Sequence, residues 1–110
     1  MFIYSTGTSN TIGITLQVGG ATQATITCND YDITDYNKYA ARWSLNEFSF
    51  FINGSEVLPR DVSGSIFPIG TLSQVQFNTG TGGALLYGKT KQVAVYNYLS
   101  DTEIQNLTTP

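Results

Sequence analysis

The stretch that decides the fold is Tyr36–Val57, YNKYAARWSLNEFSFFINGSEV. Two of its segments, Lys38–Ser44 and Glu47–Asn53, are rich in aromatic residues and flank Leu45-Asn46, so they predict two strands joined by a tight turn. Asn53-Gly54 predicts a second tight turn, because both residues tolerate positive φ. A helical period fits this stretch less well.

A two- or four-residue loop between these strands sets three cross-strand pairs: Trp43 with Phe48, Ala41 with Phe50, and Tyr39 with Ile52. Since side chains alternate along a strand, all six point to one face, which is apolar. The opposite face is mostly polar and carries Lys38, Ala40, Arg42, Glu47, Ser49, Phe51 and Asn53. One apolar and one mostly polar face is typical of a half-buried antiparallel sheet.

Two further strands are predicted before this hairpin, at Thr11–Val18 and Thr22–Cys28, because apolar and polar residues alternate in both. A two-residue loop at Gly19-Gly20 would send their apolar residues to opposite faces. A three-residue loop, Gly19–Ala21, instead sets Ile14 opposite Ile26 and Leu16 opposite Ala24. Burial favours this second register, since a one-residue slip turns every side chain to the other face.

The remainder of the chain predicts more short strands and one helical turn. Phe2–Tyr4 and Ser55–Leu58 read as short strands, and Pro59–Gly70 reads as a surface loop. Alternation predicts later strands at Gln74–Asn78, Ala84–Tyr87 and Gln92–Leu99. Ser100-Asp-Thr-Glu103 is a capping box, so it predicts a helical start from which Ile104 and Leu107 dock on the core.

Length and composition agree with one all-β domain. The chain has 110 residues, of which only 12% are charged, and it is rich in residue types that favour strands and turns. We therefore predict a single antiparallel β-sandwich or jelly roll over residues 1–110, with eight or nine short strands and one short C-terminal helical turn.

Part of the sequence resembles a known family. The pieces that carry the resemblance are Phe50-Phe51-Ile52-Asn53-Gly54 and Val95-Tyr96-Asn97 leading into Leu99–Ile104. They resemble the concanavalin A-like, laminin-G-like β-sandwich domains of bacteriophage tail and tail-fibre proteins, over residues from about 11 to 107. Domains of that family usually have more strands ahead of the matching part. The resemblance therefore leaves open a truncated copy, a fragment, or a protomer that completes its sandwich with a neighbour.

The resemblance implies a non-enzymatic module of a virion tail or fibre, which binds host-surface glycans or builds a trimeric fibre tip. The expected partners are copies of the same chain, in a trimer, together with other virion proteins and a host glycan. A monomeric carbohydrate-binding module of an enzyme or cell-surface protein, and a virion decoration protein without a ligand, are the alternatives.

Composition argues against several other functions. The net charge is −3 with no run of Lys or Arg, so we expect no nucleic-acid partner, and no apolar run is long enough to cross a membrane. We expect no secretory signal, because Met1–Tyr4 is followed at once by Ser and Thr. One Cys and no His exclude a disulfide within the chain, the usual zinc sites and His-dependent triads. No pair of acids suited to glycoside hydrolysis is present, so we expect no catalytic residues and no enzyme activity.

Three acids in the loop Asn29–Asn37 are candidate metal ligands: Asp30, Asp32 and Asp35. Ca²⁺ prefers clustered oxygen ligands of this kind. The spacing matches no defined calcium loop, and Asp is an ordinary turn residue. We therefore favour a solvated loop without a cofactor and keep Ca²⁺ as the alternative.

Sugar binding would need an aromatic ring with polar neighbours, because a pyranose has apolar faces and equatorial hydroxyls. The candidates are Phe51 with Arg42, Ser49 and Glu56 beside it, and the tyrosines Tyr31, Tyr36 and Tyr87. For Phe51 we favour a position under another strand or at a subunit contact. Trp43 is expected in the core.

Overall fold

The structure is a computed structural model that describes residues 2–5, 10–77 and 88–110. The chain forms two compact units, one made of Met1–Ile66 with Tyr98–Pro110 and the other of Phe67–Asn97. Every strand and helix in the described part of the chain belongs to the first unit.

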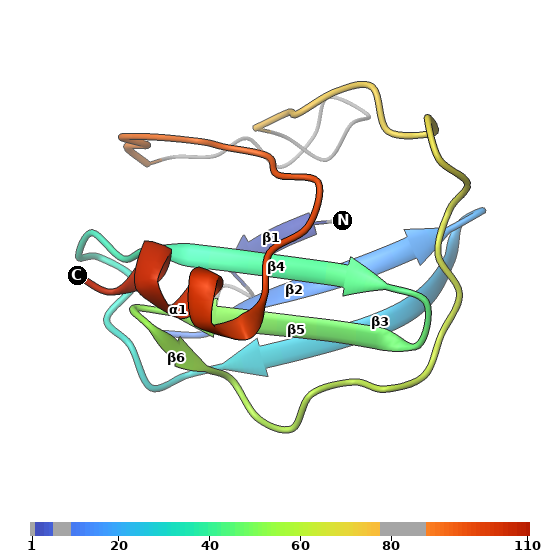
Figure 1. The fold of residues 1–110 in the computed structure, drawn as a ribbon. Helices are drawn as coiled ribbons and strands as arrows, with labels where there is room; N and C mark the ends of the chain where they lie inside the picture. The colour runs from blue at the N-terminus through green and yellow to red at the C-terminus, as the bar shows by residue number, and fades with distance from the viewer. Residues whose placement is uncertain (1, 6–9, 78–87) are drawn as a thin grey trace. The chain divides into compact units, whose positions relative to one another are not determined.

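The first unit contains two three-stranded antiparallel sheets and one helix (Figure 1). The first sheet has the order β1 (Phe2–Ser5), β2 (Ile12–Val18), β3 (Ala21–Cys28), and the second has the order β4 (Tyr39–Ser44), β5 (Glu47–Ile52), β6 (Ser55–Glu56). The helix α1 (Asp101–Thr108) contacts all three strands of the second sheet, and β3 contacts β5. The described elements are thus mostly antiparallel β-structure with one short C-terminal helix, as predicted.

The central hairpin forms with the predicted pairs. Tyr39 lies opposite Ile52, Ala41 opposite Phe50, and Trp43 opposite Phe48. Asn46 adopts a φ of 56° in the first turn, and Asn53 and Gly54 adopt φ values of 50° and 83° in the second. Positive φ at both central residues is the geometry that follows the right-handed twist of a hairpin, which is why an Asn-Gly pair occurs here.

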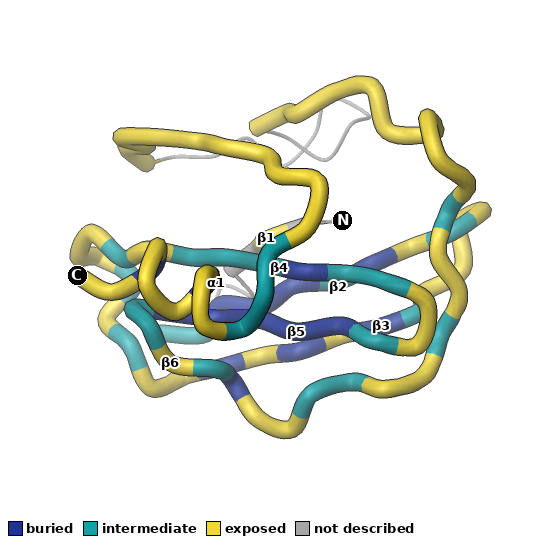
Figure 2. Tube along the Cα trace, in the orientation of Figure 1, coloured by how far each residue is buried: buried dark blue, intermediate teal, exposed yellow. Residues whose placement is uncertain are grey.

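Both faces of β5 are buried, whereas a half-buried sheet was predicted. Phe48, Phe50 and Ile52 are buried on one face, and Ser49 and Phe51 are buried on the other. Figure 2 shows β5 as buried over most of its length. β3 packs against β5, and α1 contacts β5 as well, so the strand lies between two elements. Because β3 and α1 cover both faces of β5, its sequence is a nearly continuous apolar run rather than a clean alternation.

The β2–β3 hairpin keeps the predicted register but reaches it by a different turn. Ile14 pairs with Ile26 and Leu16 with Ala24, as burial of the apolar face requires. The predicted three-residue loop is wrong: Val18 pairs with Ala21, so the turn is Gly19-Gly20 alone. The register shifts after Leu16, and the additional residue of the bulge corrects the facing of the apolar residues.

The additional residue in β3 is Gln23, which also holds the loop after β6. Its side-chain oxygen accepts a hydrogen bond from the Ser65 backbone N–H at 3.0 Å. Gly64 approaches so closely that a Cβ there would lie 2.9 Å from the Gln23 carbonyl oxygen and 3.0 Å from the Phe48 ring. The bulge therefore belongs to the contact between the two sheets.

Helix α1 begins with the predicted capping box. The Ser100 hydroxyl accepts from the Glu103 N–H, and the Glu103 carboxylate accepts from the Ser100 N–H at 2.8 Å. Ile104 is buried as predicted, but Leu107 is 49% exposed and Thr108 is buried in its place. The Thr108 hydroxyl accepts from the Gly54 N–H at 3.1 Å, which fixes the end of the helix to the Asn53-Gly54 turn.

Two of the predicted late strands are wrong. The described residues 67–77 and 88–97 of the second unit contain no strand, and Leu99 lies in irregular structure before α1. Alternation alone is insufficient, because a strand needs a neighbour to accept its backbone hydrogen bonds. The predicted strand Ala84–Tyr87 lies outside the described residues.

The Gly54 turn provides a test of the contact between α1 and the sheet. A Cβ on Gly54 would lie 2.6 Å from the Thr109 hydroxyl and 3.3 Å from its Cα, whereas one on Gly20, at nearly the same φ, meets nothing within 4 Å. Gly20→Ala should lower the free energy of unfolding by about 1 kcal/mol, the usual penalty for a side chain at positive φ. Gly54→Ala should cost clearly more, because the helix end must also move. Urea unfolding of both variants measures the difference, and equal losses would contradict this packing.

Candidate functional site

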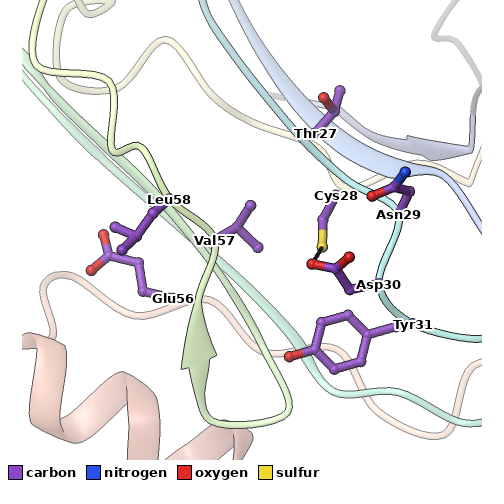
Figure 3. Close-up of a pocket in the computed structure, with 8 residues that line it drawn as sticks. All are labelled: Thr27, Cys28, Asn29, Asp30, Tyr31, Glu56, Val57 and Leu58. Atoms are coloured by element: carbon purple, nitrogen blue, oxygen red, sulfur yellow. Dashed lines mark hydrogen bonds between the residues drawn. The ribbon is translucent and has the colours of Figure 1, made fainter.

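One open pocket lies in the first unit, where β3 and β6 end. Its volume is about 240 Å³ (Figure 3). The lining residues come from two short segments of the chain: Thr27, Cys28, Asn29, Asp30 and Tyr31 from the end of β3 and the following loop, and Glu56, Val57 and Leu58 from the end of β6. Neighbouring strand ends therefore bring together two segments that are about 30 residues apart in the sequence.

Strand geometry positions the floor of the pocket. Cys28, the last residue of β3, pairs with Ile12 and is buried, while the alternate residue Thr27 is exposed. On the other side, the Val57 N–H donates to the Phe50 carbonyl at 2.8 Å, so Val57 is held beside the sheet just after β6 and is buried. The two apolar floor residues are thus fixed by backbone pairing.

Polar and aromatic groups occupy the rim. The Cys28 thiol donates to Asp30 Oδ2 at 3.7 Å, and Figure 3 shows the Asp30 carboxylate between Cys28 and the Tyr31 ring. Tyr31 is half-buried and Asn29 is exposed. These groups can accept or donate hydrogen bonds and can offer a ring face.

The loop that carries Tyr31 is organised by Asp32. Its Oδ1 accepts from the Thr34 N–H at 2.9 Å and from the Thr34 hydroxyl at 2.6 Å, and these hydrogen bonds lower the pKa of the Asp32 carboxyl. The Asp32 carbonyl accepts from Asn37 Nδ2 at 2.8 Å. Asp32 therefore acts as a turn residue.

The three candidate metal ligands have different surroundings. Asp30 lines the pocket and accepts from Cys28, and Asp32 accepts from Thr34. The carbonyl of Asp35 accepts from Asn37 Nδ2 at 3.2 Å. Within the described part of the chain, no group of three or more Asp, Glu, Cys or His side chains is placed to hold a metal ion.

The candidate ligand-binding residues also lie in different places. Tyr31 lines the pocket, and Tyr87 lies outside the described residues. Phe51 is fully buried in the second sheet, which α1 contacts, so its ring offers no face to a ligand in this structure. Arg42 is 8% exposed and is held by carboxylates. Of the residues named from the sequence, Tyr31, Asp30 and Glu56 thus line the pocket.

A cluster of five charged side chains holds the beginning of α1 on the second sheet. Arg42 contacts Glu47 and Asp101 at 2.7 Å each, and Arg60 contacts Glu47 at 2.8 Å, Glu56 at 2.6 Å and Asp101 at 2.7 Å. Two arginines and three carboxylates leave this cluster with one net negative charge. Burial of Arg42 is tolerable because two carboxylates lie beside it.

The segment before α1 is also bound to Arg42. The guanidinium donates to the Leu99 carbonyl at 3.1 Å and lies 5.6 Å from the centroid of the Tyr98 ring. Sequence reasoning did not find this cluster, which joins residues up to 59 positions apart in the chain. The only local signal was the four-residue spacing of Glu56 and Arg60, which could have indicated an ion pair.

No family model, curated protein or solved structure matches this chain. In the described residues, no helix is long and apolar enough to span a membrane.

The charge cluster predicts acid sensitivity. The hydrogen bond from Arg60, with the nearby Arg42 charge, lowers the pKa of Asp101 below its ordinary value. The ionised Asp101 carboxylate therefore stabilises the fold above the unfolded-state pKa of about 3.9. This stabilisation is lost as the pH falls through the lower folded-state pKa. When the pH is lowered from about 7 to about 2, the free energy of unfolding should fall less in Asp101→Asn than in the parent protein. Asp35→Asn is the control and should behave as the parent does. Identical pH curves for parent and Asp101→Asn would contradict the role of this carboxylate.

Proposed function

We propose that this chain is a non-enzymatic β-sandwich module of a bacteriophage tail or tail-fibre protein, which assembles with copies of itself and binds a host-surface glycan. The sandwich is supported by two antiparallel sheets whose buried apolar residues face a shared interior, with β3 in contact with β5. The attribution to a phage tail rests on the sequence resemblance.

The first of the two sequence pieces that carry the resemblance contacts the helix that begins at the end of the second piece. The Asn53-Gly54 turn closes the hairpin, and its Gly54 N–H donates to Thr108 at the end of the capped helix α1. They are separated by more than 40 residues, so their contact is a property of the fold rather than of local sequence. This contact supports the interpretation of the two pieces as parts of one structural motif.

The observation that carries the proposal of assembly is the exposed apolar surface of the second unit. Val75, Phe77, Val93, Val95 and Tyr96 are each more than half exposed. Exposed apolar side chains that form a contiguous surface are typical of sites that another chain covers, and these five side chains could contribute to such a surface.

The proposal of binding without catalysis is supported by the contacts and the pKa shifts of the acidic side chains. Asp101, Glu47 and Glu56 hold arginines, Asp32 holds a turn, and Glu103 caps the helix. General acid catalysis needs a carboxyl with a raised pKa. The carboxyl groups with a resolved shift in the described residues, Asp32, Asp101 and Glu103, all have lowered pKa values.

Assembly is tested by light scattering of the purified chain, which should give the mass of a stable oligomer, with a trimer expected. Val95→Asp should shift the mass toward the monomer, because a buried carboxylate at a chain contact is strongly unfavourable. Val62→Asp, at another exposed valine but in the first unit, is the matched control. A monomeric parent chain would favour the alternative of an isolated carbohydrate-binding module.

Receptor binding is tested on a glycan array with the oligomeric protein. Retention of a defined set of host-surface glycans is expected. An oligomer that binds none of them would instead be a structural or decoration protein.

A further inference from the structure

We propose that the pocket between the ends of β3 and β6 binds a single uncharged sugar ring, with Tyr31 as the stacking surface and Asp30 as the main hydrogen-bond acceptor. This inference rests on the proposed glycan binding and adds its place on the molecule and the class of sugar. It depends on the size, lining and charge of the pocket.

The size of the pocket limits the ligand. Its volume of about 240 Å³ lies below the range of roughly 300–1,000 Å³ that is usual for sites of drug-sized ligands. The pocket is open to solvent on one side, since Asn29, Asp30 and Leu58 are exposed. One ring, at the end or side of a glycan chain, fits such a site better than a buried oligosaccharide does.

The apolar part of the lining suits the faces of a pyranose. The Tyr31 ring is half-buried and so keeps part of its surface accessible, and Val57 forms the floor beside Cys28. In Figure 3 the Tyr31 ring and the Val57 side chain lie on neighbouring sides of the same space. The face of the Tyr31 ring can cover C–H groups of a sugar, while the sugar hydroxyls meet a lining that is mostly polar.

The polar part of the lining suits hydroxyl groups. Asp30 receives the Cys28 thiol on Oδ2, and an ionised carboxylate has about four acceptor sites on its two oxygens. Two neighbouring sugar hydroxyls can therefore donate to it in charge-assisted hydrogen bonds. Asn29 adds an amide, which can donate as well as accept.

The charge of the lining excludes acidic sugars. The eight lining residues include two carboxylates, Asp30 and Glu56, and neither lysine nor arginine. Arg60 lies beside Glu56, but it is already held by Glu47, Glu56 and Asp101 in a cluster of net negative charge. A sialic acid, uronic acid or sulfated sugar would bring a second negative charge close to Asp30 without a cation to pair with it.

Affinity for the best glycan of the array tests the position of the site. Tyr31→Ala should weaken binding by about tenfold, which is the loss of one good aromatic contact. Tyr36→Ala is the matched control, since Tyr36 lies in the same loop, is 59% exposed and does not line the pocket. Equal loss in both variants, or no loss in Tyr31→Ala, overturns the inference and leaves glycan binding itself standing. If no glycan binds at all, both the receptor function and this inference are wrong.

The only cysteine of the chain provides a second readout that does not depend on a variant. Cys28 lines the pocket, so a bound sugar should slow its alkylation by iodoacetamide in proportion to the occupancy of the site. Protection by the bound glycan and not by a non-binding sugar supports the proposal. Unchanged alkylation at a saturating concentration of a glycan that binds would place the site elsewhere.

Charge selectivity tests the class of sugar. Neutral glycans should bind and their sialylated or sulfated forms should not. Asp30→Asn keeps the shape of the side chain and removes its charge, so it should reduce this discrimination, whereas Asp35→Asn in the same loop should not. A parent protein that prefers the sialylated or sulfated forms overturns the proposal of an uncharged ligand.

Discussion

The structure depends on β5 being covered on both faces. A strand whose alternate side chains are Phe48 and Phe50 on one side and Ser49 and Phe51 on the other cannot be stable at a surface, since each exposed ring would lose about 1.5–3 kcal/mol of burial. β3 packs against the strand and α1 contacts it, so the hairpin, the first sheet and the C-terminal helix must fold together. Removal of either cover would expose aromatic rings.

The packing of α1 on the second sheet also explains the positions of the charged side chains between them. Arg42 pairs with Ser49 across the hairpin and therefore points to the same face as Phe51, where the helix packs. A guanidinium buried at this position needs carboxylates within contact distance, and Glu47 and Asp101 supply them at 2.7 Å. Asp101 stands in the first turn of α1, where a negative charge also complements the helix dipole. Asp101 thus pairs with the Arg42 guanidinium and favours the start of the helix that covers it.

Local patterns predicted the local structure, and long-range structure was predicted poorly. The register of the central hairpin followed from alternation and from an Asn-Gly turn, both of which act within about 20 residues. The bulge at Gln23 was missed, and this residue contacts residues 64 and 65, about 40 positions later in the chain, which no local pattern shows. The late strands were wrong for a related reason: the pattern around Val93 and Val95 shows which side chains are apolar but not whether a neighbouring strand exists. The pocket was found only in part, since Tyr31 and Asp30 were candidates but nothing in the sequence placed Val57 beside Cys28.

The pocket and the charge cluster share Glu56, and this connection bears on how a ligand could be bound. Glu56 lines the pocket, and its carboxylate accepts from Arg60 Nε at 2.6 Å, so the wall formed by residues 56–58 is fixed to the same cluster that holds α1. The opposite wall is fixed by the pairing of Cys28 with Ile12 and by the hydrogen bonds of Asp32. A site whose two walls are already ordered loses little conformational entropy when a ligand binds. For a small open pocket with few contacts, this preorganisation decides whether a single sugar ring can be held, and it follows from the same helix and sheet contacts that bury β5.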